Sequence, residues 1–190
     1  MTNVLGVDGA LYQAYYVAGT LAGPMSQTKK LGFLNGEASI AVTQNSANAY
    51  CAGARSIDAT ITCHQIMLGN WVDPRRHVQG TNQLLAAGCD HIVSVTGSYL
   101  PGERVAELYH DTGQRIYSVG FADDFRVKVG ASVVSSAVFY WDAPYIEIVG
   151  SYLAGNQLGG VLFSAMNTGG VDVAPPSDIV PPALLPGFEA

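Results

Sequence analysis

Short apolar segments alternate along the chain with longer segments whose apolar residues recur at helical spacing. Most of the short segments are nearly continuous in Val, Ile, Leu and Phe, a pattern typical of strands that are covered on both faces. The strands predicted in this way are residues 30–35, 60–68, 91–96, 115–121, 132–138 and 161–165.

The longer segments predict helices. One of them has clear end signals, because Asp73 can cap its first turn, Pro74 occupies that turn, and Gly88 follows its last turn. Gly113 marks the end of the next helix in the same way. The predicted helices are residues 10–25, 41–57, 74–87, 102–112 and 140–155.

From residue 30 onward, strands and helices are expected to alternate. This order implies parallel strands joined by right-handed crossovers. The sequence therefore predicts an α/β fold built on a Rossmann-like three-layer parallel sheet. Five of the nine prolines fall in the last 16 residues, so that segment is expected to be extended or disordered.

Composition adds to this picture mainly by ruling out some classes of protein. The 190 residues are 48% hydrophobic and 13% charged, against a usual charged share of about 25%, which indicates a folded core rather than disorder. With a net charge of −6 and no large cluster of bases, the chain is not expected to bind nucleic acid. No apolar run approaches the roughly 18 residues of a membrane span. The first residues lack the features of a signal peptide, so the compartment stays open.

The residue types that often carry cofactors or catalysis form no such pattern here. Cys51, Cys63 and Cys89 are odd in number and include no C-x-x-C pair, so they are interpreted as small buried apolar residues rather than as disulfide partners or zinc ligands. Neighbouring His and Cys or Asp residues on a strand would point to opposite faces and could not share a metal. Phosphate-binding glycine loops and a G-x-S-x-G motif are absent from the sequence. We therefore expect no metal, no cofactor and no catalytic residue.

A candidate site lies in the turns after the predicted strands, because open α/β sheets bind ligands at the carboxyl ends of their strands. Trp71 follows the second strand, Thr96 and Gly97 follow the third, and Asp123 and Asp124 follow the fourth. An indole can stack on a base, and a carboxylate can accept hydrogen bonds from ribose hydroxyls. The structural alternative is that the Trp covers the core and the aspartates form a turn or cap a helix. Taken together, the residues favour a neutral aromatic ligand that carries several hydroxyls.

Eight segments resemble the basic membrane protein or PnrA-like family of ABC-transporter substrate-binding proteins, whose characterised members bind purine nucleosides. Their order and spacing over nearly the whole chain carry the resemblance. The segments are YYVAGTLA at 15–22, KLGFL at 30–34, AGARS at 52–56, WVDP at 71–74, LAAGCD at 85–90, VGF at 119–121, YWDAPY at 140–145 and GGVDVAP at 169–175.

The resemblance implies the fold of a type I periplasmic binding protein, in which two Rossmann-like lobes close on a ligand. The second lobe is expected to be complete and the first partial, because the family's opening portion has no counterpart here. The chain therefore resembles a member truncated at its N-terminus. The implied division is residues 1–29 as a helix and linker of the partial first lobe, 30–125 as the second lobe, 126–172 as the crossover to the first lobe and back, and 173–190 as a proline-rich tail.

The resemblance also implies a function. The family's ligand-binding residues, matched position by position, fall on Trp71, Thr96, Gly97 and Asp124. The sequence departs from the family pattern in three places. Phe139 replaces a lysine, Ala122 replaces a polar residue, and the family's proline-rich turn after the first strand is here Glu-Ala-Ser-Ile at 37–40. The expected protein, or its truncated remnant, binds a purine-nucleoside-like molecule without chemistry and works with an ABC permease. Members of the family are secreted or anchored at the cell membrane.

Two other functions stay open. The uncovered surface of the partial first lobe could make the chain an interaction module that pairs with another chain or with itself. A Rossmann-like enzyme acting on a nucleoside or sugar, with Asp123 and Asp124 as acid and base, is less favoured. Adjacent aspartates rarely aim at one substrate atom, and no activating partner is evident.

Overall fold

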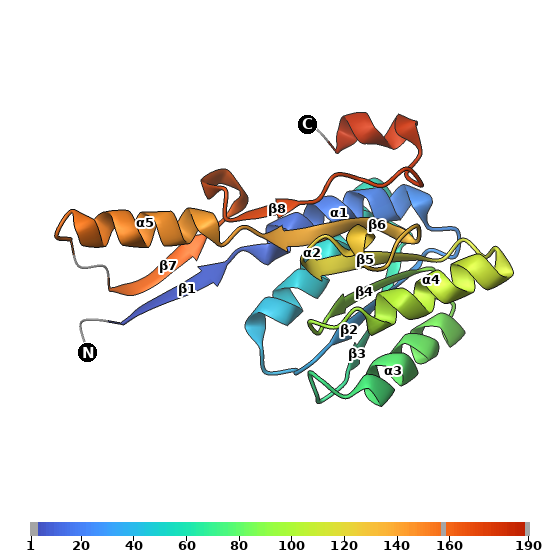
Figure 1. Ribbon diagram of the computed structural model, residues 1–190. Coiled ribbons are helices and arrows are strands. Elements are labelled where there is room, and N and C mark those ends of the chain that lie inside the picture. Colours follow the sequence, from blue (N-terminus) through green and yellow to red (C-terminus); the bar gives the residue numbers. More distant parts are fainter. Residues whose placement is uncertain (1–3, 157–158, 189–190) are drawn as a thin grey trace.

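Six strands form the larger of two sheets in the computed structural model, which describes residues 4–156 and 159–188 (Figure 1). Their order across the sheet is β3-β2-β4-β5-β6-β8. Neighbours from β3 to β6 run parallel, and β8 runs antiparallel to β6. The strands are β2 (Lys30–Asn35), β3 (Thr62–Met67), β4 (His91–Val95), β5 (Tyr117–Ala122), β6 (Val133–Phe139) and β8 (Val171–Val173).

Helices cover both faces of this sheet. Leu31 and Phe33 of β2 share one buried cluster with residues of α1 and α2, whereas Leu34 shares a second cluster with Leu84 of α3. Successive residues of the strand thus face opposite helical layers. The predicted three-layer α/β fold is confirmed. The helices are α1 (Leu11–Met25), α2 (Ala41–Ile57), α3 (Pro74–Ala86) and α4 (Leu100–Thr112).

A second, two-stranded sheet lies apart from the first. Its strands β1 and β7 pair in parallel, and α5 lies beside them, so that all three extend to the left of the larger sheet in Figure 1. We call these three elements the smaller unit, and the six-stranded sheet with α1 to α4 the larger unit. The elements are β1 (Leu5–Gly9), α5 (Asp142–Leu153) and β7 (Gly160–Ser164).

The chain passes between the two units three times. The passages lie between β1 and α1, between β6 and α5, and between β7 and β8. The Ala10 N–H donates to the Ser164 carbonyl at 2.7 Å, and the Tyr140 N–H donates to the Gly170 carbonyl at 3.0 Å. Backbone hydrogen bonds therefore join the passages to one another.

Two elements differ in position from what the family resemblance implies. The helix at 10–25 and the strand at 132–138 were expected in the first lobe, yet α1 packs on α2 and on β6, and β6 lies between β5 and β8. Leu11, Tyr15 and Val134 belong to the main buried cluster of the larger unit. Burial of these side chains holds both elements in that unit.

Two strands are missing from the sequence-based prediction. β1 has the sequence Leu-Gly-Val-Asp-Gly, in which glycines and an acid interrupt the apolar pattern, and β8 is only three residues long. Each forms by pairing with a strand far away in sequence, β1 with β7 and β8 with β6. Local pattern alone therefore gives little signal for either strand.

The C-terminal segment is folded against the core, so its prediction as an extended or disordered tail is wrong. The Ser177 N–H donates to the Val134 carbonyl at 2.9 Å, and Val180 is buried. A short 3₁₀ helix, η3 (Pro182–Gly187), follows. The proline content of this segment gives no sign of its contacts, which come from apolar side chains among and after the prolines. Those packed against the main cluster include Ile179, Leu184, Leu185 and Phe188.

The interpretation of the cysteines is wrong for two of the three. Cys51 on α2 and Cys63 on β3 form a disulfide, with their Cα atoms 6.2 Å apart. Because α2 packs against both β2 and the edge strand β3, it brings together two residues that are 12 positions apart. Cys89 carries a free, buried thiol, as expected, and burial raises the pKa of this thiol to about 11.

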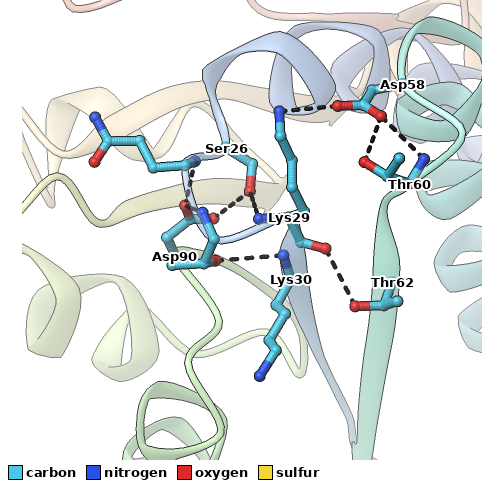
Figure 2. A network of polar contacts seen from close by, with 9 residues as sticks. Ser26, Lys29, Lys30, Asp58, Thr60, Thr62 and Asp90 are labelled. Atoms are coloured by element: carbon cyan, nitrogen blue, oxygen red, sulfur yellow. Dashed lines mark hydrogen bonds and ion pairs between the residues drawn. The ribbon is translucent and has the colours of Figure 1, made fainter.

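Asp90 organises the amino edge of the larger sheet. Its carboxylate accepts hydrogen bonds from Ser26 Oγ at 2.7 Å and from the N–H groups of Gln27 and Thr28 at 2.7 and 2.9 Å (Figure 2). His91 Nδ1 lies 3.1 Å from the same carboxylate. Burial alone would raise the pKa of Asp90, but the bonds from His91 and from these donors lower it to about 2. The network fixes the connection between α1 and β2.

Candidate ligand-binding site

The carboxyl edge of the larger sheet gathers the loops that follow its parallel strands. Trp71 follows β3, Thr96 and Gly97 follow β4, and Asp123 and Asp124 follow β5. Since β3, β2, β4 and β5 are neighbours that run in the same direction, all these loops lie at one edge of the sheet. The topology thus brings the predicted residues to one side of the molecule, away from the Asp90 network.

Trp71 lies against the backbone at the end of β2. A Cβ atom added to Gly36 would lie 2.4 Å from Cε3 of the indole, so the ring occupies the space that any other residue would fill. The loop is held by the Asn70 N–H, which donates to the Gly36 carbonyl at 3.1 Å. Asn70 Oδ1 in turn accepts from the N–H groups of Val72 and Asp73, both at 2.8 Å. Trp71 remains 36% exposed, which leaves surface for stacking.

The two candidate residues after β4 differ, because Thr96 has a buried side chain and Gly97 has an exposed backbone. Thr96 is buried, and its hydroxyl lies 2.8 Å from Ser94 Oγ, so one of these two hydroxyls donates to the other. Gly97 is exposed, has a φ of +70°, and would place a Cβ more than 4 Å from any described atom. Glycine suits this left-handed turn, and its bare backbone leaves this part of the edge open.

The two aspartates after β5 have different surroundings. Asp124 caps the 3₁₀ helix η1 (Phe125–Val127), and its carboxylate pairs with the guanidinium of Arg126. Hydrogen bonding to Arg126 lowers the pKa of this carboxyl. Asp123 is exposed, accepts from the Asp124 N–H at 2.8 Å through Oδ1, and accepts from the Tyr99 hydroxyl at 3.0 Å through Oδ2.

Asn35 is a polar residue of this edge that sequence analysis missed. It is the last residue of β2, it is fully buried, and its amide nitrogen and oxygen have no hydrogen-bond partner among the described residues. Buried amides are nearly always bonded, so an unpaired one at this edge is notable. An asparagine that ends an otherwise apolar strand was the available signal.

Aromatic side chains continue from this edge into the passage between β6 and α5. The ring of Phe139 lies 5.0 Å from that of Trp141, and Trp141 lies 6.4 Å from Tyr145, measured between ring centroids. Phe139 also packs on Gly9, at the end of β1. The position that carries lysine in the resembled family is thus part of an apolar contact between the two units.

Metal ligands do not gather within residues 4–156 and 159–188, where no group of three or more His, Cys, Asp or Glu side chains could hold an ion. Over the same residues, no helix has both the length and the apolar character needed to cross a bilayer.

The sequence match spans almost the whole chain. A family model described as ABC transporter substrate-binding protein PnrA-like matches residues 1–183. The chain belongs to this PnrA-like family. The family is one of substrate-binding proteins rather than of enzymes, in line with the prediction of binding without chemistry.

The PnrA-like chain is also similar to two curated proteins. Metabotropic glutamate receptor-like protein C of Dictyostelium discoideum is 26% identical over 155 residues, which are 81% of this chain and 19% of that protein. TsgA13 of Haloferax volcanii, whose name describes an ABC transporter glucose-binding protein, is 24% identical over 161 residues, or 85% of this chain and 39% of that protein. The chain thus spans well under half the length of these relatives.

Solved structures share the fold of the PnrA-like chain. A transcriptional activator of the comK gene from Bacillus halodurans has a TM-score of 0.82 at 19% identity, over 97% of this chain and 62% of that chain. An ABC transporter solute-binding protein from Conexibacter woesei has a TM-score of 0.72 at 18% identity, over 98% and 61%. The predicted fold of a periplasmic binding protein, with one lobe only partly present, is confirmed.

Proposed function

We propose that this chain supplies one wall of the binding cleft of an ABC-transporter substrate-binding protein, and that the cleft takes a purine nucleoside or a closely similar ring-and-sugar molecule. The observation that carries the proposal is the composition of the carboxyl edge. It combines an indole with an exposed surface, the open backbone of Gly97 and the carboxylates that follow β5.

Each of these groups suits one part of such a ligand. The exposed surface of Trp71 can stack on a purine, which is worth roughly 1–3 kcal/mol per base. A carboxylate accepts hydrogen bonds from sugar hydroxyls, and backbone groups beside Gly97 can bond the remaining polar atoms. Thr96 contributes by shaping the turn, because its own hydroxyl already bonds to Ser94.

The relatives support the sugar part of this ligand more directly than the purine. TsgA13 is named for glucose binding. A hydroxyl-rich ligand is therefore common to that relative and to this proposal, whereas the purine ring rests on the family resemblance and on Trp71.

A complete cleft needs a second wall, because bound ligands of this size usually bury most of their surface. In the proposed protein the other lobe supplies that wall, and a permease receives the ligand. The Cys51–Cys63 disulfide supports a location outside the cytosol, since such bonds persist in oxidising compartments.

Titration calorimetry with inosine, adenosine, guanosine and ribose tests the proposal. We expect nucleosides to bind, and Trp71→Ala to weaken their binding by about 1–3 kcal/mol while leaving ribose binding nearly unchanged. Val72→Ala is the matched control, because Val72 is the adjacent and more exposed residue of the same loop. Equal heats for the wild type and Trp71→Ala would contradict the assignment of the edge.

Self-association is a second candidate function, favoured by the surface of the smaller unit. Only Pro144 of α5 is buried, and residues 140–164 contain just two charged residues, Asp142 and Glu147. The exposed apolar side chains of this segment are Tyr140, Trp141, Tyr145, Ile146, Val149, Tyr152, Leu153, Val161 and Phe163.

We propose that a second copy of the chain covers this surface. An aromatic side chain can bury roughly 150–250 Å², so nine large apolar side chains that are about half exposed or more present on the order of 1,000 Å². A standard interface takes about 800 Å² from each partner. Two such faces with few charges match one another in area and in chemistry.

A further inference from the structure

The loop after β5 presents two neighbouring carboxylates to the proposed cleft, and only one of them has acceptor capacity to spare. A carboxylate offers about four lone-pair positions for hydrogen bonds. Asp124 receives four contacts from Arg126, one from its backbone N–H at 3.0 Å and three from its guanidinium. Its capacity is therefore used within its own loop.

Asp123 keeps half of its capacity. One oxygen accepts from the Asp124 N–H and the other from the Tyr99 hydroxyl, which leaves about two positions free on an exposed side chain. We infer that Asp123, held in place by Tyr99, accepts the hydrogen bonds of the ligand's hydroxyl groups, a role that the family resemblance gives to Asp124. This inference rests on the proposed function, and it names the residue that recognises the sugar.

Tyr99 is a well-anchored positioning residue. It stands just before α4, and its ring centroid lies 4.6 Å from that of Phe125. Phe125 is buried, and its N–H donates to Ser136 Oγ at 3.0 Å, so the tyrosine rests on a fixed support. Through the Tyr99 hydroxyl, the loop after β4 restrains the carboxylate that the loop after β5 presents.

A left-handed residue just before Asp123 accompanies the different partners of the two aspartate side chains. Ala122 has a φ of +65°, a left-handed conformation that is uncommon for a residue with a side chain and costs energy. After this turn, Asp123 contacts Tyr99 and Asp124 contacts Arg126. Such strained positions cluster at ligand-binding sites, where the surrounding structure maintains them.

The chemistry of Asp123 defines the class of ligand. A fixed carboxylate with two free acceptor positions suits two adjacent hydroxyl donors, as on the 2′ and 3′ carbons of a ribonucleoside. The carboxylate disfavours anionic ligands such as nucleotides, because its negative charge repels that of a nearby phosphate. A ligand that lacks one hydroxyl leaves the carboxylate unpaired in the closed cleft, and sites of this kind reject such analogues strongly.

The test compares Asp123→Asn with Asp124→Asn by calorimetric titration of inosine and 2′-deoxyinosine. We expect Asp123→Asn to weaken inosine binding about tenfold or more and to remove the preference for inosine over 2′-deoxyinosine. Tyr99→Phe should cause a smaller loss in the same direction. Asp124→Asn should keep the preference but unfold at a lower urea concentration, because it disrupts the pair with Arg126. Thermal unfolding followed by circular dichroism verifies that each variant is folded.

Two contrary outcomes are distinguishable. A wild-type chain that binds neither nucleoside would overturn the proposed function and this inference together. A wild-type chain that binds, with the hydroxyl preference lost in Asp124→Asn and retained in Asp123→Asn, would overturn this inference alone and leave the proposed function standing.

Discussion

The indole of Trp71 rests on Gly36, and the two residues are joined through the Asn70 hydrogen bond to the Gly36 carbonyl. The end of β2 and the loop after β3 thus form one continuous surface at the carboxyl edge. The absence of a side chain at position 36 sets the height and tilt of the ring. The stacking surface of the proposed site depends on this contact.

Replacement of Gly36 by alanine is expected to weaken nucleoside binding nearly as much as Trp71→Ala does. The new methyl group would lie within 2.6 Å of three ring atoms, so the indole must move. Since the moving group is a partly exposed side chain, the free energy of unfolding should fall by only about 1 kcal/mol, the low end for overpacking. Calorimetry and urea unfolding measure the two effects. Gly150→Ala on α5 is the control for the calorimetry, because its methyl group would meet no described atom within 4 Å.

Loss of the Cys51–Cys63 disulfide is expected to lower the free energy of unfolding by about 2–3 kcal/mol, from the loop-closure entropy of so short a loop. The variant Cys51→Ser with Cys63→Ser should therefore unfold at a lower urea concentration. Dithiothreitol should destabilise the wild type similarly and leave the double variant unchanged. Equal midpoints for the wild type with and without reductant would contradict the bond. Cys89 should react with thiol reagents only after unfolding, since it is buried and its pKa is raised.

Acid should remove the stabilisation that Asp90 provides. Its pKa falls from an ordinary value of 3.8 in the unfolded chain to about 2 in the folded protein. A group with a lowered folded pKa stabilises the protein above its unfolded pKa, so the contribution, about 2 kcal/mol, is present above pH 4 and disappears as the pH falls toward 2.

Urea unfolding of the wild type and Asp90→Asn across this pH range measures the effect. The difference in stability should be largest near neutral pH and shrink in acid. Asp111→Asn is the control, because Asp111 is an exposed carboxyl. A difference that stays constant from pH 7 to pH 2 would argue against the ionised carboxylate as its source.

The surface of the smaller unit predicts a dimer. Sedimentation velocity of the wild-type chain should show a concentration-dependent second species at twice the monomer mass. The double variant Ile146→Lys with Leu153→Lys should sediment as a monomer, because both side chains are more than two thirds exposed on α5. Val127→Lys, at an equally exposed position in η1, should leave the association unchanged. A wild-type chain that sediments only as monomer would rule out the second copy.

Strands buried on both faces were the most predictable part of the fold. The bounds of β2 and α2 agree with the sequence pattern to the residue, because nearly every side chain of β2 is buried and α2 has a sharply amphipathic face. β1 and β8 were not predictable from local sequence, since their hydrogen-bond partners lie far away in the chain. The disulfide depended on tertiary geometry in the same way, because only the packing of α2 beside β3 brings Cys51 to Cys63.

In the candidate site, too, some features could be predicted from the sequence and others depend on tertiary structure. Parallel topology was enough to place Trp71, Gly97 and the two aspartates at one edge. Sequence could not distinguish Asp123 from Asp124, because the difference arises from the left-handed turn at Ala122 and from partners at Tyr99 and Arg126. Nor could it indicate that the amide of Asn35 is unpaired, which depends on burial.

The triple passage of the chain between the larger and smaller units has a mechanical consequence. A protease that cuts the passage between β6 and α5 gives two fragments that each contribute strands to both units, because β1 pairs with β7 and β6 pairs with β8. The nicked molecule should therefore migrate as one particle on gel filtration and fall into fragments only in denaturant. Three passages joined by backbone hydrogen bonds should also limit the relative motion of the two units more than a single linker would.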